Sequence, residues 1–120
     1  MHVLNAAAPL SAEHGLEVAG SIYETPEGLF RYTFPRIGEA SRASLTTRYR
    51  GYHAHPSGEL VFSNEFTNTG DHDYNWVRTA RKDLYLGVVG SKGAVRIGVC
   101  EYGKCSGSGR FGTDPSRVLQ

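Results

Sequence analysis

Two histidines separated by one residue have the spacing of a metal-binding pair. His53 and His55 lie in the stretch Tyr-His-Ala-His-Pro at positions 52–56. If this stretch is a strand, the two imidazoles point to the same side, because side chains alternate along an extended backbone. Both can then reach one metal ion, and a carboxylate from the next element would complete a set of two nitrogens and one oxygen. Such a set leaves a fourth position for water, as in catalytic zinc sites.

Carboxylates elsewhere in the chain could complete such a site, which also needs a general base and groups that steady a developing oxyanion. Asp73 is the candidate third ligand because we expect it in the first turn of the following helix, and Asp71 is its competitor. Glu17 lies on the first expected strand, where it could face the same edge of the sheet. A structural alternative stays open, in which the imidazoles are hydrogen-bonded at a polar strand end and the aspartates only cap the helix.

These residues resemble the metal-binding signature of the JAB/MPN family of zinc metalloproteases, the JAMM motif. That motif reads His-x-His-Pro, then Ser, then Asp, with a Glu far upstream. Ser63 follows the histidines here, and residues 16–20 are similar to the glutamate strand of the family. The resemblance implies that His53, His55 and an aspartate bind Zn²⁺. It also implies that Glu17 takes the proton from zinc-bound water and that Ser63 helps to stabilise the tetrahedral intermediate.

The position of the aspartate departs from the family pattern. In the family the aspartate follows the serine after two residues, and Phe66 occupies that place here. Asp73 can be the ligand only with seven extra residues, which 64–70 would supply as an insertion. The displaced aspartate favours an alternative hypothesis, in which the chain is a catalytically inactive interaction module of the same fold.

A small uncharacterised JAB-like domain, found near the C-termini of Rhs-type polymorphic toxins and other secreted bacterial effectors, is more similar still. The shared pattern covers roughly residues 17–98 and includes Glu-x-x-Gly-x-Ile-Tyr, Tyr-His-x-His, Phe-Ser, Asp-x-x-Trp and Tyr-Leu-Gly. The resemblance implies a toxin domain that is secreted without a cleaved signal peptide, acts in the cytoplasm of a target cell and has a cognate immunity protein. Otherwise we expect a cytoplasmic protein. A metal-dependent toxin that acts on nucleic acid is a second alternative.

Length and composition predict one globular domain over residues 1–120. The chain has 120 residues, of which 39% are hydrophobic and 21% are charged, as is typical of a folded protein. A formal net charge of +1 gives no general case for nucleic-acid or membrane binding. No apolar run approaches the roughly 20 residues that a membrane-spanning helix needs. Cys100 and Cys105 are too few for a disulfide scaffold, and either a local bridge or two free thiols fits their spacing.

Local patterns place the candidate site residues on strands, a loop and a helix. Pro9 is expected to end a short helix over residues 2–9, followed by a turn over 11–15, within an N-terminal helix or linker remnant over 1–15. The Thr-Pro-Glu-Gly turn predicts a hairpin over 16–34. The remaining expected elements are a central strand in the second half of 45–55, a long polar loop over 57–72, a helix from Asp71 or Asp73 to about Lys82, strands over 84–89 and 94–100, and a flexible tail over 103–120.

Together these elements predict an α+β fold with a mixed sheet of about five strands and one or two helices. The resemblance implies the JAB/MPN, deaminase-like version of that architecture. The functional expectation is a Zn²⁺-dependent peptide or isopeptide hydrolase, with His53, His55 and Asp73 as metal ligands and with Glu17 and Ser63 as catalytic residues. Its expected partners are a protein or peptide substrate and an immunity protein, rather than a membrane or a nucleic acid.

Overall fold

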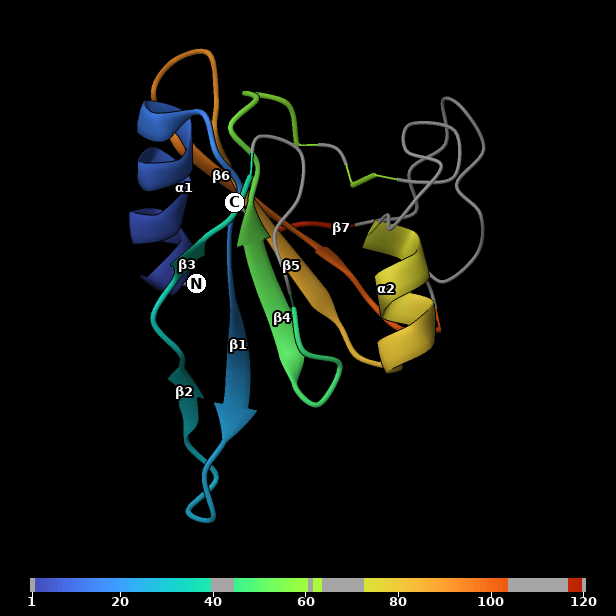
Figure 1. The fold of residues 1–120 in the computed structure, drawn as a ribbon. Coiled ribbons are helices and arrows are strands. Elements are labelled where there is room, and N and C mark those ends of the chain that lie inside the picture. The colour runs from blue at the N-terminus through green and yellow to red at the C-terminus, as the bar shows by residue number, and fades with distance from the viewer. Residues whose placement is uncertain (1, 40–44, 61, 64–72, 104–116, 120) are drawn as a thin grey trace.

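The computed structural model describes residues 2–39, 45–60, 62–63, 73–103 and 117–119, which form a sheet with one helix on each side (Figure 1). This arrangement confirms the predicted α+β class with a mixed sheet. Seven strands are present in the described ranges, and β3 and β7 are only two residues long. The elements are α1 (His2–His14), β1 (Val18–Glu24), β2 (Phe30–Tyr32), β3 (Arg36–Ile37), β4 (Arg50–Ala54), α2 (Asp73–Ala80), β5 (Leu84–Val89), β6 (Val95–Cys100) and β7 (Arg117–Val118).

The sheet has one parallel pair near its centre. The strand order is β2-β1-β4-β5-β6-β7, with β3 also paired to β1. The β4–β5 pair is parallel and the other pairs in the described ranges are antiparallel. α2 makes the crossover between β4 and β5, because a tight turn cannot join parallel neighbours. The hairpin predicted over 16–34 is confirmed, β5 and β6 form a second hairpin, and Gly28 and Gly93 adopt positive φ in their turns.

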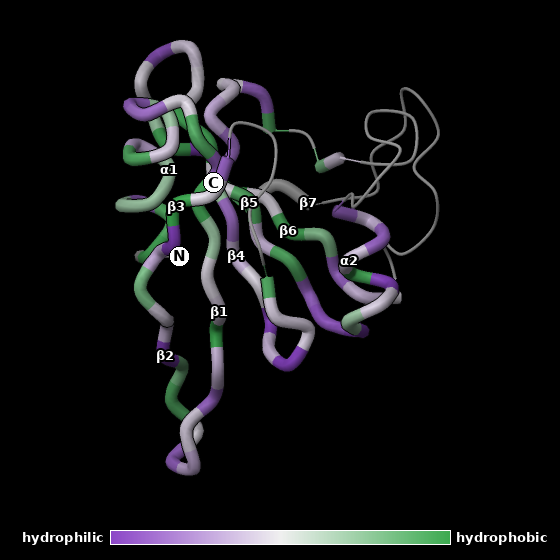
Figure 2. The backbone as a smooth tube through the Cα atoms, in the orientation of Figure 1, coloured by the Kyte–Doolittle hydropathy of each residue, from purple (hydrophilic) through white to green (hydrophobic). Residues whose placement is uncertain are grey.

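Alternation along the strands separates two hydrophobic clusters, one on each face of the sheet. On β4, the side chains of Tyr52 and Ala54 belong to the cluster under α1. The ring of His53 lies instead beside Phe62, which belongs to the cluster under α2. Hydrophobic residues run along β5 and β6 in the middle of the sheet (Figure 2). Because β4 is hydrogen-bonded to a strand on each side, the backbone at His53 is held firmly in place.

The first helix is longer than predicted. The expected helix end at Pro9 and the expected turn over 11–15 are wrong, because α1 continues to His14. Pro9 lies on the exposed side of the helix, whereas Leu4 and Ser11 are buried. The backbone hydrogen bond that is lost at Pro9 is therefore outweighed by burial of the opposite side against the sheet.

The C-terminal part of the chain contributes one more strand. β7 pairs with β6, so part of the predicted flexible tail over 103–120 is instead tied to the sheet, while residues 104–116 lie outside the described ranges. Cys100 is disulfide-bonded, and Cys105, the other cysteine of the chain, lies outside the described ranges. Among the described residues, neither helix has the length and apolar character that a membrane span requires.

Candidate metal centre

The two histidines lie on one side of the sheet, as their spacing predicts. His53 is a residue of β4 and its side chain is 3% exposed. His55 follows the strand, and its N–H donates to the Gly87 carbonyl at 3.2 Å. The centroids of the two rings are 4.6 Å apart and the ring planes are nearly perpendicular, at 82°. The two imidazoles can therefore contact one ion from different directions.

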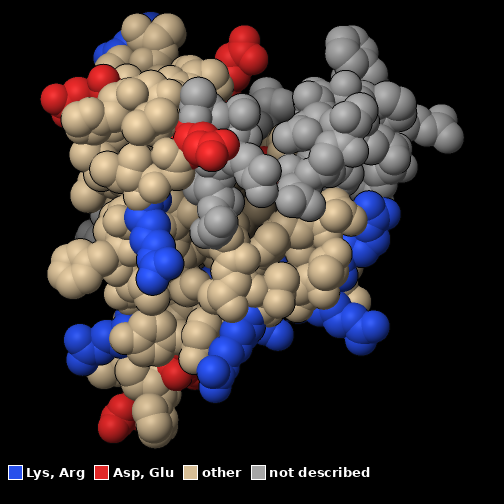
Figure 3. All heavy atoms as spheres, viewed as in Figure 1, with Lys and Arg blue, Asp and Glu red and all other residues tan. Residues whose placement is uncertain are grey.

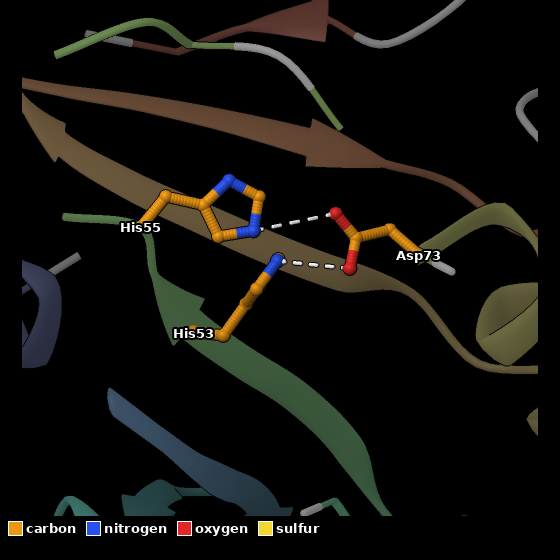
Figure 4. A group of neighbouring side chains, drawn as sticks. All are labelled: His53, His55 and Asp73. Carbon is orange, nitrogen blue, oxygen red and sulfur yellow. Dashed lines mark ion pairs between the residues drawn. The ribbon is translucent and has the colours of Figure 1, made fainter. Parts of the chain in front are cut away.

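Asp73 approaches both imidazoles from the start of α2 (Figure 4). Its Oδ1 lies 3.1 Å from Nε2 of His53, and its Oδ2 lies 3.5 Å from Nε2 of His55. One possible ligand atom from each of the three residues lies within 4.8 Å of the other two, so the group could hold a metal ion. Asp71, the competing ligand in the sequence analysis, lies outside the described residues.

Ser63 holds Asp73 through reciprocal hydrogen bonds. The Ser63 N–H donates to Oδ2 of Asp73, and the Asp73 N–H donates to Oγ of Ser63, each at 2.8 Å. The Tyr74 N–H also donates to the Ser63 carbonyl, at 3.2 Å. Ser63 thus satisfies two of the open N–H groups at the start of α2, as a helix cap does. Ser63 and Asp73, which lie on either side of residues 64–72, meet in this contact. The seven residues by which the chain exceeds the serine-to-aspartate spacing of the JAMM motif therefore do not keep Asp73 away from the histidines.

Glu17 reaches the same group from the start of β1. β1 and β4 are antiparallel with Val18 opposite Ala54, and the same register continued by one residue places Glu17 opposite His55. Oε1 of Glu17 lies 3.7 Å from Nε2 of His55. On its other side the Glu17 N–H donates to the Glu39 carbonyl at 2.7 Å, which holds the backbone. All five predicted site residues therefore gather at one end of the β1–β4 pair.

Burial and neighbouring charges shift the pKa values of this group. Burial raises the pKa of Glu17 to about 7, with His53 opposing the rise and Asp73 adding to it. Burial alone would disfavour the charged forms of His53 and Asp73, but their mutual attraction outweighs it. The pKa of His53 is therefore raised and the pKa of Asp73 is lowered to about 2. In the metal-free protein the positive charge of protonated His53 stands beside Asp73 where a metal ion would bind, so protons and metal compete for the group. A bound dication would itself lower the pKa of Glu17.

The geometry at His53 fits a metal ligand better than a simple ion pair. Its Nε2 is buried and has no hydrogen-bond partner in the described part of the chain, although Oδ1 of Asp73 is only 3.1 Å away. Its Nδ1 lies 2.9 Å from the Tyr85 carbonyl, to which it can only donate, and this tautomer leaves the lone pair of Nε2 for a metal. Tetrahedral zinc with bonds of about 2.0–2.1 Å separates its ligand atoms by about 3.3–3.4 Å. The separations of 3.1 and 3.5 Å between Asp73 and the two histidines are close to that value.

Two neighbours of His53 were not predicted from the sequence. The Tyr85 carbonyl orients the imidazole, and the fully buried ring of Phe62 lies 6.0 Å from it between centroids. A main-chain acceptor leaves no signal in the residue types. Phe62 did leave one, because it belongs to an apolar stretch at positions 60–62 that interrupts a largely polar loop directly before Ser63.

Comparison with known proteins assigns no family to the chain. No protein-family model matches it, and no curated protein and no solved structure is significantly similar to it. The residues of the site are therefore the basis for proposing a function.

Proposed function

We propose that this chain is a Zn²⁺-dependent hydrolase of peptide or isopeptide bonds, similar to the JAB/MPN metalloproteases. The observation that carries the proposal is the buried Nε2 of His53, which lacks a hydrogen-bond partner among the described residues and belongs to the group with His55 and Asp73. A buried nitrogen whose nearest acceptor is not aligned for a hydrogen bond is costly unless something else binds it. A metal ion shared with the two neighbouring ligands would supply that partner.

Zinc is the metal that we propose for this set of donors. Two imidazole nitrogens and one carboxylate oxygen match the three protein ligands of catalytic zinc sites, in which a fourth position stays open for water or substrate. Mg²⁺ and Ca²⁺ prefer oxygen ligands and larger ligand sets. When bound, zinc would lower the pKa of a coordinated water to about 7 and polarise the carbonyl of the scissile bond.

Glu17 is the residue that would move the proton. Its carboxylate lies beside the metal-ligand group, 3.7 Å from Nε2 of His55, without being one of the three ligands. From this position Oε1 can accept a proton from the attacking water and deliver it to the leaving amine. The side chain is 13% exposed, so bulk water has little access to that proton.

Ser63 has a proposed role in the reaction besides capping α2. Its Oγ accepts a hydrogen bond from the Asp73 N–H, and the hydroxyl proton remains available for donation. The same hydroxyl can therefore hold Asp73 and donate to a developing oxyanion, which is the role that the family resemblance implies.

We further propose that the hydrolase is the toxin domain of a secreted bacterial effector and acts in the cytoplasm of a target cell. The support is the order of the motifs shared with the JAB-like domains of polymorphic toxins, from Glu17 to the Tyr-Leu-Gly sequence at 85–87. A cognate immunity protein in the producing cell is the partner that such an activity requires.

Elemental analysis tests the metal site. Protein purified without a histidine tag should contain about one equivalent of zinc, and the double variant His53→Ala/His55→Ala should contain none. His14→Ala is the matched control, because it removes an exposed histidine at the end of α1 and should leave the metal content unchanged. Absence of zinc from the wild-type protein, even after zinc is supplied, would overturn the proposal.

Peptide turnover tests the reaction. Zinc-loaded protein should create new termini in a proteome-derived peptide mixture analysed by mass spectrometry, and chelation of zinc should stop it. Glu17→Gln should abolish turnover at unchanged zinc content, because glutamine cannot accept the proton. Retained turnover in this variant would remove Glu17 from the reaction. Cleavage of plasmid DNA or RNA that is lost on chelation, without peptide cleavage, would assign the metal to nucleic-acid chemistry instead.

A further inference from the structure

The edge of the sheet at β2 exposes large apolar side chains. Leu29, Phe30, Phe34 and Ile37 are 57, 53, 94 and 56% exposed, respectively. β2 is the last strand on this side of the sheet and lies at the lower left of Figure 1. Single exposed apolar residues are ordinary, but four of them within one edge segment indicate an interaction surface.

The backbone of β2 presents free hydrogen-bonding groups along the same edge. The Thr33 N–H donates to the Ser21 carbonyl at 2.9 Å, so residue 33 is a position that faces β1. Hydrogen-bonded positions alternate in an antiparallel pair, so Arg31 also faces β1, whereas the N–H and C=O groups of Phe30 and Tyr32 point away from it. An extended segment of another protein can pair with these outward groups as an added strand.

Positive charge surrounds this apolar edge. Glu24 and Glu27 at the hairpin tip are outnumbered by exposed arginines, and blue atoms lie over this lower part of the molecule in Figure 3. None of these arginines forms an ion pair with a carboxylate within the described ranges. They lie on β2, on β3, just before β4 and on β4: Arg31, Arg36, Arg48 and Arg50.

Two of the arginines lie over aromatic rings. Cζ of Arg50 is 5.5 Å from the ring centroid of Phe30, and Cζ of Arg48 is 5.4 Å from that of Tyr49. These contacts hold the guanidinium groups at the surface and leave their N–H groups available to a partner. Arginine and aromatic residues are also the types that contribute most binding energy in protein interfaces.

We propose that the β2 edge binds an extended, acidic segment of a partner protein, which adds a strand to the sheet at Phe30 and Tyr32. Carboxylates of the added strand would meet Arg31 on one face and Arg50 on the other. Its apolar side chains would cover Phe34. None of these residues belongs to the metal centre, so this inference goes beyond the hydrolase proposal and can fail independently of it.

Two other occupants fit this edge less well. A second copy that paired antiparallel through β2, in the register that sets Phe30 opposite Tyr32, would place two Arg31 side chains directly opposite each other, where like charges destabilise a strand pair. Single-stranded nucleic acid needs open aromatic faces on which its bases stack. The rings of Phe30 and Tyr49 already carry Arg50 and Arg48, and the exposed ring of Phe34 alone gives no run of stacking platforms for successive bases. An acidic polypeptide uses both the outward backbone groups and the unpaired charges.

The first test uses the full chain and two short synthetic peptides, one that repeats Glu-Glu-Val-Val, so that carboxylates lie on both faces of the added strand, and a twin that repeats Lys-Lys-Val-Val. In amide NMR the Glu peptide should bind, with the largest shifts at Phe30 and Tyr32, and its affinity should fall as salt is raised. The Lys peptide should not bind. The proposal is overturned if the Glu peptide does not bind, if both peptides bind equally, or if a single-stranded oligonucleotide binds more tightly than the Glu peptide.

Matched variants separate charge from strand pairing. Arg31→Glu/Arg50→Glu should weaken binding of the Glu peptide about tenfold or more, whereas Arg78→Glu/Lys92→Glu makes the same charge change at exposed sites elsewhere and should have little effect. Tyr32→Pro removes an outward N–H and should abolish binding, while Tyr32→Ala should retain most of it. Circular dichroism checks that each variant is folded. Unchanged affinity in the folded Arg31→Glu/Arg50→Glu variant or in the folded Tyr32→Pro variant contradicts the proposal.

Discussion

Ser63→Ala tests the contact between the serine and Asp73, because it removes the hydroxyl and keeps the main chain. Oγ of Ser63 accepts a hydrogen bond from the Asp73 N–H at 2.8 Å, whereas the bond from the Ser63 N–H to Oδ2 of Asp73 does not need the side chain. The variant therefore loses one of the two bonds that hold Asp73. Loss of a helix-cap hydrogen bond costs about 1 kcal/mol, so the free energy of unfolding should fall by that amount. The melting temperature should fall by about 4 °C.

The same variant should bind zinc about tenfold more weakly. Groups that orient metal ligands contribute about 10–100-fold in affinity, and the lower end applies here because the main-chain bond to Asp73 remains. Competition with a chromophoric chelator measures the Kd for zinc, and calorimetry measures the melting temperature. Ser63→Thr keeps a hydroxyl, and Ser57→Ala changes an exposed serine. Both should retain wild-type values.

An unchanged Kd for zinc together with an unchanged melting temperature would refute this reasoning. If turnover nevertheless collapsed in Ser63→Ala, the hydroxyl would act on the reacting carbonyl, as the family resemblance implies. If both values shift as expected while turnover per bound zinc is retained, Ser63 is a positioning residue that acts through Asp73.

Stability measurements by urea denaturation test three further features. Gly20→Ala should lower the free energy of unfolding by about 1–3 kcal/mol, because the added Cβ would overlap the ring of Tyr52, and a wild-type value would contradict this packing. Zinc at about 100 times its Kd should raise the free energy of unfolding by about 2.7 kcal/mol, and His53→Ala/His55→Ala should not respond. Folding lowers the pKa of Asp73 from 3.8 to about 2, so the zinc-free protein should lose stability as the pH falls through this range. The Asp73→Asn variant should not show this loss of stability at low pH. The charged form of His53 stabilises the fold at low pH, and this contribution should disappear as the pH rises through the raised pKa of His53. A free energy of unfolding that only rises with pH would therefore contradict the ion pair between His53 and Asp73.

Features that depend on neighbouring residues were predictable from the sequence. The shared direction of His53 and His55 follows from alternation along an extended backbone. The turn at 25–28 follows from the φ preferences of proline and glycine, and the apolar run over 84–89 predicted a strand. In each case backbone geometry acts over a few residues, so the order of residue types is sufficient. The JAB/MPN family, the zinc and the effector role stay predictions.

Features that depend on distant contacts were not predictable in this way. Propensity alone ends a helix at Pro9, but α1 continues because Leu4 and Ser11 are buried against the sheet. The pairing of Arg50 with Phe30 exists only because the β1–β2 hairpin folds beside β4. The free energy of these contacts comes from residues that are far apart in the sequence, so a pattern of neighbouring residues cannot predict them.

The aspartate shows the same division most clearly. The sequence by itself determined that two histidines share one side of a strand and that carboxylates are available upstream and downstream. Only the tertiary structure decided that Asp73 stands beside both histidines, through its contact with Ser63 on the far side of residues 64–72. The physical reason is that spacing within a strand follows from rigid backbone geometry. The closure of a long segment depends instead on the contacts at its ends, and extra residues within it add little to the cost.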